Sequence, residues 1–152
     1  MTRSGVAGAA LVLACGSALI AAPSAQAASA SVARTGLVVA NAARLAHGCA
    51  PLTLSSKLGR AAQRHATDMA NNEYFSHTSP DGTTWGVRIK RAGYAHPAGE
   101  TLAFGYDAVS GAVRSWLAAP KQRHTLLNCD VKKIGVGYAN LDGGYWVADL
   151  GY

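Results

Sequence analysis

The stretch KIGVGYANLDGGYWVADLG, residues 133–151, contains the clearest strand signals of the chain. Ile134, Val136 and Tyr138 alternate with smaller residues, the period of two that predicts a strand. The segment NLDGG (140–144) contains an Asp-Gly pair typical of a hairpin turn, and the apolar YWVADLGY runs back after it. These residues predict an antiparallel hairpin.

The sequence before this hairpin predicts mainly helices. Apolar residues recur at helical spacing over 35–46, where Gly48 and Pro51 follow as stop signals, and again from Leu58 to Met69. The alternating segment 99–106 predicts another strand, and residues 84–91 and 108–117 predict two more helices. Helices combined with a terminal hairpin indicate an α+β fold, in which helices cover a small antiparallel sheet.

The N-terminus has the pattern of a secretory signal peptide over residues 1–27. Arg3 precedes an apolar stretch, and Ala25-Gln26-Ala27 forms a small-residue cleavage site. We expect a secreted protein cleaved near Ala27, with a flexible leader at 28–34, one domain at 35–152 and no stable membrane span. A lipid anchor on Cys15 is the alternative.

The cysteine count depends on that cleavage. Of the three cysteines, Cys15 would leave with the signal peptide, so that Cys49 and Cys129 remain. An exported chain meets an oxidising environment, which predicts a Cys49–Cys129 disulfide.

Charge argues against a nucleic-acid partner. The chain has 14 Lys and Arg and 8 Asp and Glu, and loss of Arg3 leaves a net charge of about +5. The basic residues are scattered and form no stripe with interleaved aromatics. The charge is compatible with attraction to anionic cell-wall polymers or lipid headgroups.

Two histidines and one acid are candidates for chemistry. His77 and His124 flank segments that are neither clear helix nor clear strand, where functional residues concentrate. Glu100 opens an apolar strand, so its carboxylate needs a cation, a histidine or a metal as partner. Spacing alone does not pair it with His77. The remaining histidines are expected at packing or surface positions: His47, His65 and His96.

Four segments together resemble the bacterial branch of the CAP (or SCP) superfamily of cysteine-rich secretory proteins, venom allergens and pathogenesis-related proteins. They are AAQRHATDMANNEYFSHTSPDG (61–82), GYAHPAGETLAFGY (93–106), SWLAAPKQRHTLLNCDVKKIGVGY (115–138) and GYWVADLG (144–151). The resemblance covers about residues 37–151. It implies an α-β-α sandwich, and the contexts of Cys49 and Cys129 are similar to those of a cystine in related members.

The resemblance also implies a cleft with up to two histidines and two acids, which bind a divalent metal in some members. His77 matches the first histidine and Glu100 matches one acid, although Thr101 replaces the usual asparagine after it. The second acid falls on Ala119 and the second histidine on Gln122. This chain therefore keeps two of the four cleft residues.

Those two residues are a poor ligand set for a tightly bound metal. Zinc usually takes three or four protein ligands, and calcium takes more oxygens than His77, Glu100 and Gln122 supply. His124 stands two places past Gln122 and is a weak substitute for the missing histidine. We expect a His77–Glu100 hydrogen bond that organises the cleft, with zinc or calcium as a weakly bound alternative.

Three functions are compatible with these residues. The first is a binding module whose cleft holds a small molecule, a lipid or sterol, or a cell-wall fragment against His77, Glu100, Gln122 and His124. The second is a protease-like hydrolase that uses His77 and Glu100, although the sequence offers no convincing nucleophile. The third is a structural or immune-modulatory protein with an inert cleft.

Overall fold

The computed structural model describes residues 24–152, which form five helices and one four-stranded sheet. Residues 1–23, with most of the expected signal peptide and Cys15, lie outside this range. In chain order the elements are α1 (Ala25–Ala46), β1 (Thr53–Leu54), α2 (Ser56–Asn71), α3 (Trp85–Arg91), β2 (Pro97–Phe104), α4 (Val109–Ala118), α5 (Pro120–Leu126), β3 (Lys133–Asn140) and β4 (Gly144–Gly151).

The sheet has the strand order β1-β3-β4-β2, with the predicted hairpin at its centre. On β4, Val147 is paired antiparallel with Gly137 of β3 and with Leu102 of β2. The expected sheet was purely antiparallel, and β1 changes that, because Thr53 pairs in parallel with Lys133. A strand of two residues has no periodicity from which a sequence could predict it.

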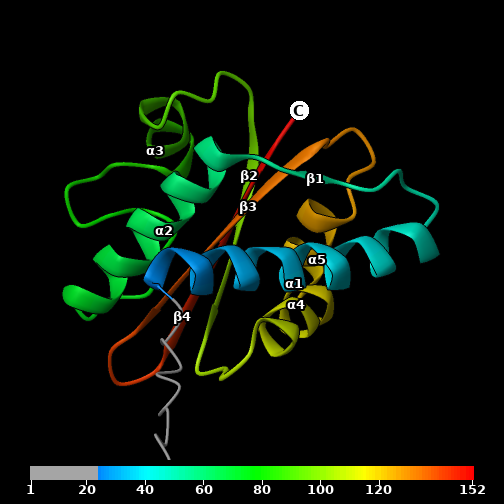
Figure 1. Ribbon diagram of the computed structural model, residues 1–152. Helices are drawn as coiled ribbons and strands as arrows, with labels where there is room; N and C mark the ends of the chain where they lie inside the picture. Colours follow the sequence, from blue (N-terminus) through cyan, green and yellow to red (C-terminus); the bar gives the residue numbers. More distant parts are fainter. Residues whose placement is uncertain (1–23) are drawn as a thin grey trace, which may run out of the picture.

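Helices cover both faces of the sheet, which confirms the expected α+β sandwich. In Figure 1 the strands pass between α2 and α3 on one side and α4 and α5 on the other. On the α2 face, residues of the helix pack with side chains of β2 and β4: Ala62, Ala66, Met69, Leu102, Tyr145 and Val147. On the other face, α1, α4 and α5 pack on the opposite set of strand residues, among them Ile134, Val136, Trp146, Ala148 and Leu150.

Two glycines of β3 let α2 lie directly on the sheet. A Cβ added at Gly135 would lie 2.0 Å from the backbone nitrogen of Gly59, and one at Gly137 would lie 2.3 Å from the carbonyl carbon of Ala62. No side chain fits at either position, so these glycines set the distance between helix and strand.

Two segments differ from the sequence expectation. Residues 28–34, expected as a flexible leader, lie within α1, where Val32 and Ala33 pack against the core and alanine favours helix. The predicted helix over 108–117 corresponds to α4, and a further helix, α5, begins directly after it at Pro120, because proline is well tolerated at the first helical position.

The predicted disulfide between Cys49 and Cys129 is confirmed. Beside it, the fully buried Arg44 of α1 donates hydrogen bonds to the carbonyls of Ala50, Leu126, Asn128 and Val131. The end of α1 is thus tied both covalently and by hydrogen bonds to the segment that leads into β3.

Candidate functional site

The fold brings His77 and Glu100 into direct contact. His77 lies in the loop between α2 and α3, and Glu100 lies on β2 with its side chain fully buried. His77 Nδ1 is 2.8 Å from Glu100 Oε1. Because an ionised carboxylate only accepts hydrogen bonds, Nδ1 carries the proton in this contact. The contact therefore fixes the ring orientation of a histidine whose side chain is 48% exposed.

Arg88 of α3 is the second partner of Glu100, and sequence reasoning missed it. Its Nη2 lies 2.8 Å from Glu100 Oε2 and 3.0 Å from the carbonyl oxygen of His77. Its Nη1 donates to the carbonyl of Thr83 and to Ser79 Oγ. One guanidinium thus pairs the buried acid and also holds the loop that carries His77.

His65 of α2 is buried behind this pair. Its Nε2 is 2.9 Å from the carbonyl oxygen of Ser76, to which it donates, and 4.0 Å from Glu100 Oε1. Burial lowers the pKa of His65, and the attraction of Glu100 offsets this only in part. The expectation of a packing role agrees with its burial, but His65 also holds the backbone immediately before His77.

Tyr74 and Asp68 continue the network on the far side of His65. The Tyr74 hydroxyl donates to Asp68 Oδ2, and His65 Nδ1 lies 3.5 Å from the same hydroxyl. Burial, together with the hydrogen bond to Asp68, raises the pKa of Tyr74 to about 12. Tyr74 therefore remains a neutral donor at physiological pH.

Asp149 of β4 lies beside Glu100 and is the second residue that sequence reasoning missed. It is fully buried and directly opposite Glu100 in the β2–β4 register. Burial first, and then the negative charge of Glu100, raise the pKa of Asp149. His77 and Arg88 bond the oxygens of Glu100, whereas the oxygens of Asp149 have no hydrogen-bond partner among residues 24–152, so Asp149 is the member that holds the proton. The available signal was an acid inside the apolar run YWVADLG.

A hollow of about 540 Å³ opens beside the exposed face of His77. Its walls are mostly apolar and include both positions at which the family's other cleft residues were expected, Ala119 and Gln122. Gln122 Oε1 accepts a hydrogen bond of 2.6 Å from the backbone nitrogen of Leu102, so its amide is held by β2. We call this the His77 hollow; it is lined by Phe75, Ser76, His77, Leu102, Ala119, Pro120, Lys121 and Gln122.

His124, the fourth predicted ligand-binding residue, is not brought to this hollow. It lies on α5 and lines a different hollow, together with His47 and Asn128. The helical turn of α5 separates it from Gln122 around the helix axis, since residues two apart lie on different sides of a helix.

The donor set does not fit a divalent cation. Each oxygen of Glu100 already has a partner, His77 for Oε1 and Arg88 for Oε2. The Arg88 guanidinium stands where it would repel a second cation, and Ala119 offers no ligand atom. Within residues 24–152, no group of three or more His, Cys, Asp or Glu side chains is arranged to hold a metal.

The hydroxyls beside His77 are engaged elsewhere. Ser76 Oγ accepts a hydrogen bond from the Thr78 backbone nitrogen, and Ser79 Oγ accepts from Arg88. Within the described chain, none of the hydrogen bonds of His77 reaches a serine or threonine hydroxyl. The geometry thus supplies an oriented imidazole without the adjacent nucleophile of a serine hydrolase.

Comparison with known proteins identifies the family. The cysteine-rich secretory protein family, CAP, matches residues 37–150. This chain belongs to the CAP family. The expected resemblance is confirmed, and the His77–Glu100 contact lies inside the matched region.

Two curated relatives come from Bacillus subtilis strain 168. The uncharacterized protein YkwD is 32% identical over 107 residues, which cover 70% of this chain and 41% of YkwD. The uncharacterized membrane protein YlbC is 34% identical over 102 residues, covering 66% of this chain and 30% of YlbC. This CAP chain spans less than half the length of either relative.

Solved structures agree with the family assignment. An extracellular protein containing an SCP domain from Bacillus anthracis superposes with a TM-score of 0.74 at 27% identity, over 84% of this chain and 42% of that one. An outer surface protein from Borrelia burgdorferi has a TM-score of 0.69 at 24% identity, over 78% of this chain and 90% of that one. In the described part of this CAP chain, every helix is too short or too polar to cross a bilayer.

Proposed function

We propose that this CAP domain is an extracellular binding module that takes a small, partly apolar ligand into the His77 hollow. The single observation that carries the proposal is the combination of a mostly apolar hollow with one oriented imidazole at its wall. Apolar walls with a few fixed polar groups are what small-molecule sites share. A lipid or sterol, or a cell-wall fragment with an apolar part, matches this chemistry.

His77 supplies polar recognition in this proposal. With Nδ1 bound to Glu100, the opposite ring nitrogen, Nε2, is left to meet a hydroxyl or carboxyl group of the ligand. Arg88 and His65 contribute indirectly, because their hydrogen bonds hold Glu100 and the loop that carries His77 in position. The cleft is therefore preorganised, which reduces the entropy lost on binding.

An extracellular location is part of the proposal. It is supported by the signal-peptide pattern of residues 1–27, by the disulfide, and by the similar Bacillus anthracis protein, which is described as extracellular. Recovery of the disulfide-bonded protein from the culture medium would test it, and exclusive recovery from the cytoplasm would contradict it.

Ligand binding is tested by filling the hollow. Fluorescent fatty acid, fluorescent sterol and a soluble peptidoglycan fragment are titrated into the wild type and into Ala119→Trp. We expect saturable binding of at least one probe, weakened about tenfold or more by the substitution. Ala95→Trp, at an exposed position outside the hollow, is the matched control. Absence of saturable binding for all three probes would favour an inert cleft.

A further inference from the structure

A second hollow of about 550 Å³ lies beside the same buried cluster and is lined by a different set of residues. Its walls come from α2, the turn at 79–83 and α3. His65 and Arg88 line this hollow, whereas His77 lines the other one. Glu100, whose side chain is fully buried, contacts both His77 and Arg88. We call this second hollow the arginine hollow, because Arg64, Arg88 and Arg91 line its walls.

The acidic side chains of the arginine hollow are already engaged. Asp68 accepts hydrogen bonds from the Tyr74 hydroxyl and from Asn72 Nδ2. Asp81 accepts from the backbone nitrogen of Thr83 at 2.8 Å and from its hydroxyl at 2.9 Å. Both carboxylates therefore serve to shape the turn and the end of α2, and within residues 24–152 neither forms an ion pair with an arginine.

Two of the three arginines, by contrast, form no close ion pair among the described residues, although the charge of Arg91 adds to the hydrogen bonds from Thr83 in lowering the pKa of Asp81. Within residues 24–152 the acidic side chain that pairs with an arginine is Glu100, which bonds Arg88 and also contacts His65 and His77, so that Arg64 and Arg91 form no ion pair. The contact of Arg91 with Thr83 Oγ1 is long, at 3.4 Å. Arg64 comes from α2 and Arg91 from the end of α3, so two guanidinium groups from separate helices share one hollow.

We propose that the arginine hollow binds the phosphate monoester of a sugar or polyol. A phosphate monoester carries close to two negative charges and three acceptor oxygens, and the planar guanidinium fork matches such an anion in bidentate fashion. Asp68 and Asp81 retain lone pairs beyond those already used and accept hydrogen bonds from the ligand's hydroxyl groups. The volume of the hollow suits one sugar or polyol unit.

This site is separate from the one proposed for the apolar ligand. It shares no lining residue with the His77 hollow, and its ligand is polar and anionic. Either proposal can fail while the other stands, because the two experiments use different probes and different substitutions.

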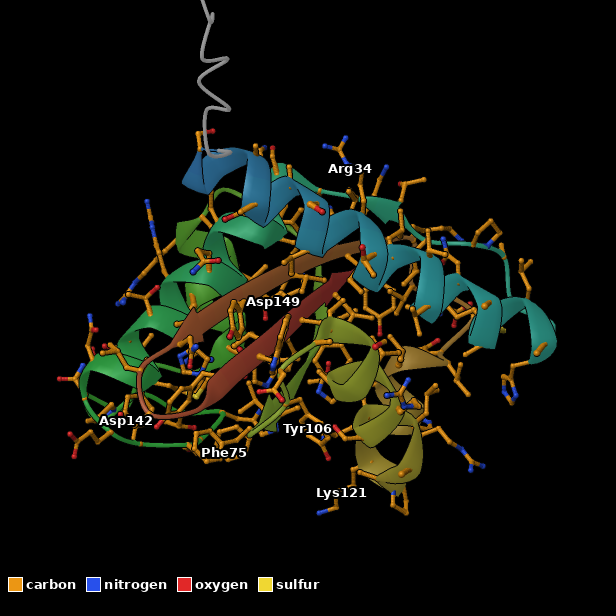
Figure 2. All side chains as sticks on the ribbon, turned by 60° about the horizontal axis from the view of Figure 1, so that its bottom comes forward. Arg34, Phe75, Tyr106, Lys121, Asp142 and Asp149 are labelled. Atoms are coloured by element: carbon orange, nitrogen blue, oxygen red, sulfur yellow. A yellow bond between two sulfur atoms is a disulfide. The ribbon has the colours of Figure 1, made fainter. Side chains whose placement is uncertain are left out.

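The test is calorimetric titration of the disulfide-bonded protein at physiological salt with sn-glycerol 3-phosphate, inorganic phosphate and neutral glycerol. We expect saturable binding of glycerol phosphate, weaker binding of inorganic phosphate and none of glycerol. Arg64→Gln and Arg91→Gln should each weaken glycerol phosphate binding about tenfold, the loss expected for one charge-assisted hydrogen-bond pair. Arg34→Gln, which makes the same charge change on α1 (Figure 2), should leave the affinity within about twofold.

Several results would overturn the proposal. Equal weakening by Arg34→Gln would mean that the net charge of the protein, and not the hollow, attracts the anion. Inorganic phosphate binding as tightly as glycerol phosphate would remove the assignment to an ester. Absence of saturable glycerol phosphate binding in the wild type would remove the site altogether.

Discussion

Glu100 of β2 and Asp149 of β4 are directly paired in the sheet, and both side chains are buried. Two carboxyl groups are therefore neighbours in the interior of the protein. Figure 2 shows Asp149 in the interior, on β4, which is one of the two central strands of the sheet. Arg88 and His77 bond the oxygens of Glu100, while the oxygens of Asp149 have no hydrogen-bond partner among the described residues. The cluster is therefore electrically balanced only while Asp149 holds a proton.

The protein should lose stability as the pH rises from acidic values, because Asp149 is buried beside Glu100. An aspartate in an unfolded chain has a pKa of about 3.9. Burial beside Glu100 raises the pKa of Asp149 in the folded protein. Above pH 4 or so, the folded state therefore keeps a proton that the unfolded state releases. The contribution of Asp149 to stability is present at acidic pH and is lost as the pH rises toward the raised pKa.

Asp149→Asn should remove this loss, because asparagine does not ionise. Urea unfolding is measured between pH 4 and 8. The free energy of unfolding of the variant, relative to that of the wild type, should increase with pH by up to about 1.4 kcal/mol per pH unit. Asp107→Asn, at an exposed position, is the control. Parallel curves for Asp149→Asn and the wild type would contradict the assignment of the proton.

Arg88 is expected to be the main stabiliser of the buried charge. Arg88→Met leaves Glu100 without its cation and should lower the free energy of unfolding by roughly 3 to 5 kcal/mol. Arg91→Met, on the same helix but exposed, should change it by less than about 0.5 kcal/mol. If Glu100 is the reason, adding Glu100→Gln to Arg88→Met should recover part of the loss. A double variant less stable than Arg88→Met would refute that explanation.

Metal should have little effect on the folded protein. Both Glu100 oxygens are occupied by His77 and Arg88, so a cation would have to displace a strong hydrogen bond to bind. We expect the melting temperature to stay within about 1 °C when EDTA, zinc or calcium is added. A rise with zinc that EDTA reverses and His77→Ala abolishes would show that the pair opens to form a metal site.

The disulfide is expected to contribute a large part of the free energy of unfolding. Cys49 and Cys129 are 80 residues apart, and closing a loop of that length is worth about 4 kcal/mol on the chain-entropy model. Substituting both cysteines by alanine should lower the free energy of unfolding by that order. Reductant should destabilise the wild type similarly and leave the double variant unchanged. A sensitivity to reductant that persists in the double variant would point to a different cause.

The sequence by itself determined the elements whose signals are local. Alternation predicts β3 and β4 because side chains of a strand alternate between faces, and the Asp-Gly turn sets their antiparallel return. Gly48 marks the end of α1, where it adopts a positive φ angle. The family motifs marked His77 and Glu100 and showed that Ala119 and Gln122 replace two expected cleft residues.

Only the tertiary structure decided which side chains surround Glu100. Arg88 reaches it because α3 packs beside β2, and Asp149 reaches it because the strand register places the two acids opposite each other. Neither contact leaves a period or a spacing in the sequence. The same holds for Arg44, whose carbonyl partners lie up to 87 residues away. Local patterns specify an element through its own backbone, whereas the pairing of buried charges depends on how separate elements pack.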